Sequence, residues 1–286
     1  MRHDVTRTIS YASAARSRLG RLVIRGLENA TGRLGLIRRA KGYEDDLAKG
    51  RAFWEVIPER YGLTLDVTEG DLARIPKTGP LILIANHPYG ILDGLMMALI
   101  LHRIRGDFRI LANAVFMKAP ALDDVILPIS FDETPDALRL NIATRAKALD
   151  YLGQGGAIGV FPGGTVSTAA KPFSEPLDPV WRGFTAKMIA KAGATVVPVY
   201  FEGHNSRLFQ IASHLHYTLR LGLLMKEFRA RTDTPVRVRI GAPIAPQDLP
   251  RASGEMMDQL RRATYALSPT PLSPYALGYE FEARYR

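Results

Sequence analysis

Short apolar runs alternate with longer segments of helical periodicity from residue 81 onward. The runs are four to seven residues long and rich in Val, Ile, Leu and Phe, as buried strands are. The pattern predicts strands at 81–85, 108–111, 125–129, 157–161, 195–201 and 236–240. It predicts helices at 44–60 (ending near Pro58), 94–104, 135–152, 179–192 and 206–231.

Strands that alternate with helices predict an α/β fold, with a mixed, largely parallel sheet flanked by helices on both faces. In such sheets, ligands bind outside the carboxyl ends of the strands. Polar residues that directly follow the predicted strands are therefore the first candidates for a functional site.

A second pattern occupies the N-terminal segment. Apolar residues recur there at steps of three and four, which predicts a helix with one apolar stripe formed by Leu19, Val23, Leu27, Ala30, Leu34 and Ile37. Each of four glycines weakens this helix by up to about 1 kcal/mol relative to alanine, so we expect it to be broken or to form only on binding. We treat residues 1–45 as a separate helical segment and residues 46–286 as the main domain.

The net charge of the N-terminal segment indicates what it contacts. Residues 1–41 contain ten Arg and Lys against two acidic residues, which is +8 of the formal net charge of +10. A basic amphipathic helix can lie in a lipid interface, where each cation near an anionic surface contributes about 1 kcal/mol. Packing on the domain with a solvated arginine face is the alternative. Nucleic acid is disfavoured, because no aromatic residues interleave the basic ones. We expect membrane contact through Arg16, Arg18, Arg21, Leu22, Arg25, Leu27, Leu34, Arg38 and Arg39.

Composition narrows the chemistry. The chain has no cysteine, which excludes a cysteine nucleophile, an enzyme thioester and thiolate metal sites. Its histidines lack HExxH spacing, so we expect no metal site. The longest apolar run, 95–101, has seven residues, against about 20 for a membrane span.

The first strand end places a histidine before a carboxylate, in the sequence LILIANHPYGILDGL. Asp93 at a helix start is explained by capping alone, and His87 beside a turn can be structural. Together they indicate a general base, because a carboxylate fixes the imidazole tautomer and stabilises the imidazolium. No GxSxG nucleophile elbow occurs, so we expect the base to activate a substrate hydroxyl directly.

Two further strand ends carry polar or glycine-rich groups. The sequence GGAIGVFPGGTVST lacks the Rossmann glycine spacing and a following GK[ST], so Gly163-Gly164 is either a tight turn or a backbone surface that a substrate approaches. After the strand at 195–201, Glu202, His204, Asn205 and Arg207 form a polar cluster. One such residue is explained as a helix cap; four indicate a site for a polar head group.

The blocks NHPYGILDG, FPGGTVST and VVPVYFEGHNS together resemble the glycerolipid acyltransferase family typified by lysophosphatidic acid acyltransferase. The resemblance covers residues 78–245. It implies that His87 is the general base, that Asp93 orients it, that 162–168 (with Gly163, Gly164 and Thr165) contribute to the acceptor site and that Pro198 lies on the acyl-donor side. It also implies a fatty acyl thioester donor, on acyl carrier protein or coenzyme A, no other cofactor, and a peripheral or monotopic place on the cytoplasmic face of the bacterial inner membrane.

Three departures from the family pattern change the expected acceptor. Five residues separate His87 from Asp93 where the family has four, and Gly90 is the residue that can absorb the extra one. Gly163 replaces the acid of FPEGTRS and Val166 its arginine, so a bidentate phosphate contact is lost there. Lys118 can supply charge, but only as a flexible point charge.

The variant blocks resemble a bacterial branch that acylates lyso-aminolipids such as lyso-ornithine lipid. We therefore expect a lyso-aminolipid acceptor, bound through Glu202, Asn205 and Arg207, with lysophosphatidic acid as the alternative. A non-catalytic lipid-binding protein and a lipid hydrolase are more remote alternatives.

Overall fold

A computed structural model describes residues 10–15, 17–113, 122, 124–130, 134–273 and 275–280. A seven-stranded sheet has the order β1-β9-β8-β2-β5-β3-β4. Its strands, in chain order, are β1 (Thr64–Glu69), β2 (Leu81–Ala85), β3 (Arg109–Asn113), β4 (Ile126–Ile129), β5 (Ala157–Val160), β8 (Thr195–Phe201) and β9 (Pro235–Ile240). Five strands run parallel, whereas β9 is antiparallel to β8 and β1 follows β9. The predicted mixed, largely parallel α/β sheet is confirmed.

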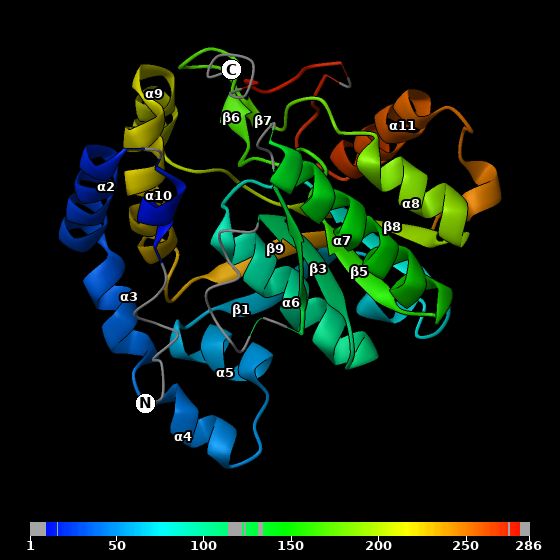
Figure 1. Cartoon of the computed structure of the whole chain (residues 1–286), viewed down its shortest axis with the longest axis horizontal. Helices are drawn as coiled ribbons and strands as arrows, with labels where there is room; N and C mark the ends of the chain where they lie inside the picture. The colour runs from blue at the N-terminus through cyan, green and yellow to red at the C-terminus, as the bar shows by residue number, and fades with distance from the viewer. Residues whose placement is uncertain are drawn as a thin grey trace.

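Helices cover both faces of the sheet, as the alternation of side chains in each strand requires. On one face Leu81 and Leu83 pack against α6 (Ile91–Arg105) and α5 (Phe53–Arg60). On the other face Ile82 and Ile84 pack against α7 (Pro135–Gly153), α8 (Phe184–Ala192) and α11 (Ser253–Tyr265). Figure 1 shows α7, α8 and α11 grouped on one side of the molecule, away from α2 and α10. The carboxyl edge of β2 is thus held between two packed layers.

The six predicted strands all occur, with ends within two residues of those predicted. The edge strand β1 and the two-residue strands β6 (Thr168–Ala169) and β7 (Pro176–Leu177) were not predicted, because they are short or lack an apolar run. Predicted helix 44–60 is wrong as a single helix, since α4 (Tyr43–Ala48) and α5 are separated at Gly50, where φ is +82°. Predicted helix 206–231 is likewise two helices, α9 (Arg207–Leu215) and α10 (Tyr217–Arg229), because His216 is extended.

The N-terminal segment forms two helices that lie against α10, as Figure 1 shows at the left of the view. They are α2 (Arg18–Thr31) and α3 (Arg33–Ala40), so the expected break occurs at Gly32. A Cβ at Gly32 would lie 2.6 Å from the Met225 carbonyl oxygen, so only glycine lets the helices approach this closely. The segment therefore shares a core with the main domain.

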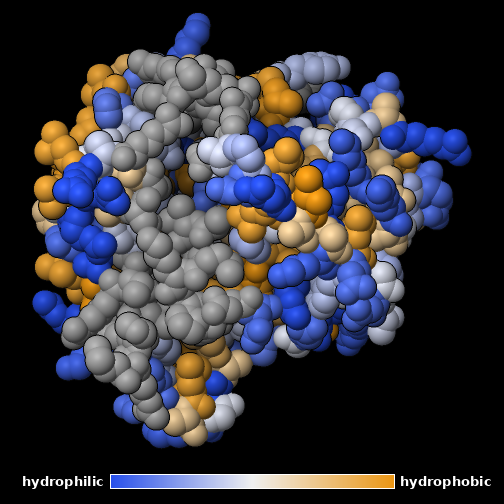
Figure 2. Space-filling model, viewed as in Figure 1, coloured by the Kyte–Doolittle hydropathy of each residue, from blue (hydrophilic) through white to orange (hydrophobic). Residues whose placement is uncertain are grey.

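The first part of the apolar stripe of α2, Leu19 and Val23, faces outward, together with the neighbouring Leu22. Leu19 and Leu22 are 72% and 71% exposed, whereas the fully buried residues of this helix are Ile24 and Glu28. Figure 2 shows hydrophobic and hydrophilic surface side by side at the left edge of the view, where α2 and α3 lie. Of the residues expected at the membrane, Arg18, Arg21, Leu22, Leu34 and Arg38 are exposed to solvent. No helix of the described residues is long and apolar enough to span a membrane.

Four other expected membrane contacts lie differently. Leu27 packs on α10, where its side chain lies 2.8 Å from the position of a Cβ at Gly222, and Arg25 is half-buried. Arg39 is exposed but forms an ion pair with Asp233. Arg16 lies outside the described residues.

Candidate active site

Asn86 and His87 follow β2 at the carboxyl edge of the sheet. The Asn86 amide donates to the Phe201 carbonyl (2.9 Å) and accepts the Phe201 N–H (2.7 Å), which ties the chain to the end of β8. The His87 carbonyl accepts the Ser167 N–H (2.8 Å). Its ring stacks on Phe161, with 4.3 Å between the ring centres. Backbone bonds on both sides therefore fix the position from which the imidazole projects.

The structure brings His87 and Asp93 together. Nδ1 of His87 lies 3.0 Å from Oδ2 of Asp93, and the side chains are 19% and 0% exposed. Nδ1 has no well-aligned hydrogen-bond partner among the described residues, so the contact with Oδ2 is electrostatic in this geometry. Catalytic hydrogen bonds of free enzymes are often poorly aligned in this way. Because Nδ1 faces the carboxylate, Nε2 is the nitrogen left for proton transfer.

Gly90 lies in the turn between His87 and Asp93. Its φ of +93° turns the chain so that α6 begins at Ile91 and Asp93 occupies the third position of the helix. Oδ2 of Asp93 then accepts the backbone N–H groups of Tyr89 (2.7 Å) and Gly90 (3.0 Å). One carboxylate oxygen thus caps the helix and also faces His87, so the capping that is present does not exclude the expected catalytic role.

The charge state of Asp93 reflects opposing effects. Complete burial raises the pKa of Asp93, whereas His87 and the two backbone N–H groups lower it. Its other oxygen, Oδ1, is buried without a hydrogen-bond partner among the described residues. Burial dominates, so the folded protein holds this carboxylate at a free-energy cost.

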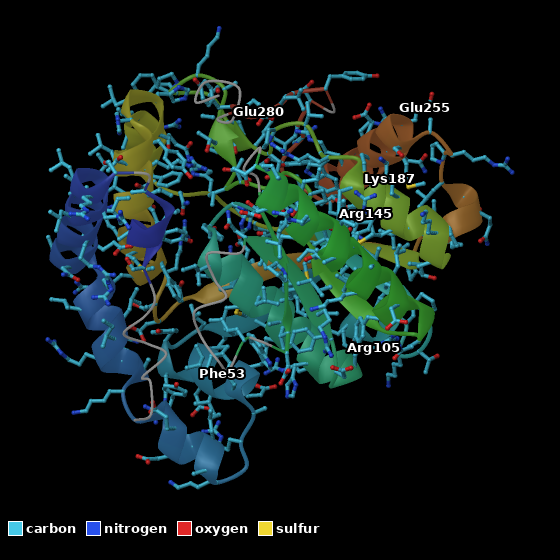
Figure 3. All side chains as sticks on the ribbon, in the orientation of Figure 1. Phe53, Arg105, Arg145, Lys187, Glu255 and Glu280 are labelled. Atoms are coloured by element: carbon cyan, nitrogen blue, oxygen red, sulfur yellow. The ribbon has the colours of Figure 1, made fainter. Side chains whose placement is uncertain are left out.

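At the far end of α6, Arg105 donates to the carbonyls of Pro76 (2.9 Å), Gly79 (2.5 Å) and Gly155 (2.5 Å). Figure 3 labels Arg105 at this end, beside the amino edge of the sheet. The helix that carries Asp93 is thereby anchored at both ends.

The glycine-rich block, residues 162–168, passes beside the pair of His87 and Asp93, which we call the dyad. Gly164 has φ +67° and its N–H donates to the Phe161 carbonyl (3.0 Å), so a tight turn is present and this N–H is already used. Gly163 lies against Asp178, whose Cβ would be 3.2 Å from a Cβ at residue 163. Thr165 accepts a hydrogen bond from Arg220 (3.1 Å). The acid expected at 163 by family pattern would occupy the space that Asp178 fills.

Asp178 is a buried carboxylate that the sequence patterns did not single out. Its Oδ1 accepts the His87 backbone N–H (3.2 Å) and the Ser167 hydroxyl, and its Oδ2 accepts the Trp181 indole N–H (2.9 Å). It is 0% exposed. It therefore links the turn of residues 86–90 to the glycine-rich block through the backbone of His87. We call this turn the catalytic turn, after the expected role of His87.

Arg220 of α10 reaches the place where the family pattern has an arginine side chain. It donates to the Val166 carbonyl (2.7 Å) and to the hydroxyls of Thr165, Thr168 and Ser213. It is only 2% exposed, and Val166 is itself buried. The buried guanidinium therefore holds the 165–168 segment in place, and it is not a cation exposed at the surface.

The third predicted cluster is only partly assembled. Glu202 accepts hydrogen bonds from Thr68 and Arg239 (both 2.7 Å), and Asn205 is 1% exposed with its amide unpaired among the described residues. Arg207 is exposed and donates to the carbonyls of Pro172 and Ser174, so it does not join Glu202.

The last expected site residues lie elsewhere. His204 contacts the Asn205 carbonyl through Nδ1 (2.9 Å). Pro198 is buried within β8, opposite Ile84 of β2, and Lys118 lies outside the described residues. No group of three or more potential metal ligands occurs among the residues that the structure describes.

A cavity of about 320 Å³ opens at the same edge of the sheet. One wall comes from the catalytic turn and α6, through Tyr89 and Leu92, and the rest from the end of β8 and the start of β9. Two arginines line it, Arg231 and Arg237, together with Glu202. No sequence pattern indicated Arg231, because it follows the end of α10 and belongs to no motif.

A family model described as "Acyltransferase" matches residues 26–270. The chain belongs to this acyltransferase family. A similar solved structure is that of the 1-acyl-sn-glycerophosphate (LPA) acyltransferase PlsC from Thermotoga maritima, with 19% identity and a TM-score of 0.48, over 90% of this chain and 83% of that chain. No curated protein matches the sequence. The expectation of an acyltransferase enzyme is confirmed, and the site described above is where its chemistry is to be sought.

Proposed function

We propose that the acyltransferase moves a fatty acyl group from a thioester of acyl carrier protein or coenzyme A to the hydroxyl of a lyso-aminolipid, in membrane lipid biosynthesis. Nε2 of His87 takes the proton of the acceptor hydroxyl while its oxygen attacks the thioester carbonyl. The tetrahedral intermediate then expels the thiolate, which receives that proton from the His87 imidazolium. Asp93 holds the ring and stabilises its charge, and no enzyme-bound acyl intermediate forms.

The observation that carries this proposal is the 3.0 Å contact between His87 Nδ1 and the fully buried Asp93. Burial of a carboxylate is unfavourable, and capping of α6 needs only a neutral acceptor such as asparagine. A charged acid beside an imidazole at the carboxyl edge of the sheet is explained by general-base catalysis. A lipid-binding protein without catalysis has no need of it.

The glycine-rich block supports the proposed acceptor class. Gly163 and Val166 replace the acid and the arginine of the family pattern, and both positions are buried. Arg220, which reaches this block, already bonds four oxygen atoms. The described part of the block therefore presents no free cation for a phosphate, which supports a lyso-aminolipid over lysophosphatidic acid.

The outward stripe of α2 supports a peripheral place on an anionic membrane, which we propose to be the cytoplasmic face of the bacterial inner membrane. Leu19, Leu22 and Val23 are exposed there beside Arg18 and Arg21. Apolar side chains of this kind enter the acyl boundary while the arginines attract anionic lipid. The same surface would bring the acceptor lipid to the carboxyl edge of the sheet.

Product analysis with purified protein tests the reaction. Wild-type protein, acyl thioester and either lyso-ornithine lipid or lysophosphatidic acid are incubated with vesicles, and the products are identified by mass spectrometry. We expect the diacylated aminolipid to form faster than phosphatidic acid. Free fatty acid as the main product would show a hydrolase, and faster phosphatidic acid formation would refute the acceptor assignment.

A further inference from the structure

Arg231 is a cation without a carboxylate partner at the wall of the cavity. Its guanidinium stacks on the Tyr89 ring, 4.6 Å from the ring centre, and one nitrogen donates to the His204 carbonyl (2.9 Å). None of the described carboxylates forms an ion pair with it. Stacking and the single hydrogen bond fix the plane of the guanidinium and leave further N–H groups available, as a bidentate anion contact requires.

The neighbouring charges make the cavity two-signed. Arg237, which is largely exposed, lies 3.5 Å from Asp66, and Glu202 is a largely buried residue of the lining. Burial raises the pKa of Glu202, but hydrogen bonds from Arg239 and Thr68 outweigh burial and lower the pKa. This side chain therefore stays ionised. Both bonds go to Oε1, and no hydrogen bond among the described residues uses Oε2.

Tyr89 joins the cavity to the catalytic turn. Burial raises the pKa of Tyr89 to about 12, although Arg231 acts against this shift, so the phenol stays protonated and donates to the Glu202 carbonyl (2.7 Å). Tyr89 is two residues from His87, and β9 is two strand positions from β2 in the sheet. Two strand spacings are about 10 Å, so the start of β9 lies close to the edge of the sheet from which His87 projects.

We propose that this cavity binds the zwitterionic head group of the acceptor, with its carboxylate on Arg231 and its ammonium on Glu202. Arg231 thus replaces Arg207, which the sequence had indicated. The inference rests on the proposed function, because it names the part of a lyso-aminolipid that the site recognises. A volume of about 320 Å³ accommodates an amino-acid head group, since a water molecule occupies about 30 Å³.

The first test measures steady-state kinetics of Arg231→Gln, with Arg251→Gln as a control that removes an exposed arginine at the start of α11. Loss of a charge-assisted bidentate contact should raise KM for lyso-ornithine lipid about tenfold or more. KM for the acyl thioester should stay within about twofold, and Arg251→Gln should match wild type. A rise in the thioester KM instead would place an anion of the donor in the cavity, and no change in either KM would exclude a substrate.

The second test needs no turnover and therefore separates this inference from the proposed reaction. Melting temperatures are measured with Nα-acetylornithine, which has a carboxylate and an ammonium, and with inorganic phosphate. We expect Nα-acetylornithine to stabilise wild type and Arg251→Gln, but neither Arg231→Gln nor Glu202→Gln. Stabilisation by phosphate alone, or equal stabilisation of all four proteins by Nα-acetylornithine, would overturn the assignment even if acyl transfer is confirmed.

Discussion

Asp178 holds the backbone of His87 rather than its ring. The carboxylate accepts three donors that belong to the catalytic turn, the glycine-rich block and Trp181. A further residue, Tyr265, has its hydroxyl 2.7 Å from the Asp178 backbone nitrogen. Because each donor would be buried and unpaired without it, Asp178 determines both the stability of the site and the direction of the imidazole.

We expect Asp178→Ala to lower the free energy of unfolding by about 3 kcal/mol or more, since it leaves several buried donors unpaired. Ser167→Ala removes one donor and keeps the carboxylate, so it should cost about 1 kcal/mol. Urea unfolding followed by circular dichroism measures both. A loss for Asp178→Ala no larger than that for Ser167→Ala would refute the central place of this carboxylate.

Asp93 should make stability depend on pH in a defined direction. Burial raises the pKa of Asp93 above its ordinary value of 3.8, so the folded state binds this proton more tightly than the unfolded state does. The stabilising effect of that proton is complete below pH 3.8 and is lost as pH rises through the folded-state pKa. Asparagine keeps the acceptor for Tyr89 and Gly90 without the buried charge.

Asp93→Asn should therefore melt higher than wild type at pH 8, by a margin that shrinks toward pH 4, while its activity is largely lost. Asp258→Asn, at an exposed position of α11, should show no such pH-dependent margin. Thermal melts across this pH range decide the point. A margin that is constant, or that grows as pH falls, would contradict the burial argument.

At the scale of single residues, local sequence patterns predicted the pair of His87 and Asp93. They did not predict the distant residues around that pair. His87 and Asp93 are six positions apart, so one strand end and one helix start indicate both. Asp178 is 91 residues from His87, and Arg231 is 27 residues from His204. Contacts over such separations depend on how the elements pack, which hydrophobic periodicity does not specify.

The helices α2 and α3 show how a periodic pattern can predict an element and leave its orientation open. The stripe of Leu19, Val23 and Leu34 predicts a helix, and helices are present. Yet the buried face is carried by Ile24 and by Glu28, whose carboxylate accepts the Ser10 hydroxyl (2.5 Å) and the Tyr11 N–H (2.7 Å). The stripe alone left open whether the helix lies at a lipid surface or packs on the domain, and it did not indicate that Glu28 is buried with donors 17 and 18 residues away.

Leu22→Glu should release the protein from anionic vesicles without unfolding it. Leu22 is 71% exposed, so its replacement leaves the core intact, and the glutamate makes α2 less apolar and less basic. The matched control is Leu138→Glu, which changes an exposed leucine (62%) of α7. Vesicle co-sedimentation at low and high salt measures binding. If both variants bind as wild type does, α2 is not the membrane contact.

In the whole molecule, both ends of the described chain pack against the catalytic turn and the segments that follow it in the site. The Tyr11 hydroxyl lies 3.3 Å from the position of a Cβ at Gly90. From the other end, the N–H groups of Gly278 and Tyr279 donate to the carbonyls of Asp178 (2.9 Å) and Thr168 (3.0 Å). The N-terminal helices are therefore part of the site's support as well as its outward surface.

Removal of residues 1–41 should consequently lower the melting temperature as well as vesicle binding, because it uncovers the face of α10 on which Ile24 packs. Differential scanning calorimetry of the truncated and full-length chains measures the change. An unchanged melting temperature would show that the segment is an independent anchor, as the boundary at residue 45 implied.

The central claim is that Nε2 of His87 removes the acceptor proton during acyl transfer. The direct test is the single-turnover rate of diacylated lipid formation by wild type and His87→Ala, with circular dichroism spectra and melting curves to show that both fold. A positioned general base contributes about 10²- to 10⁴-fold, so His87→Ala should lose at least about a hundredfold in rate. A folded His87→Ala protein that transfers acyl groups near the wild-type rate would contradict the account.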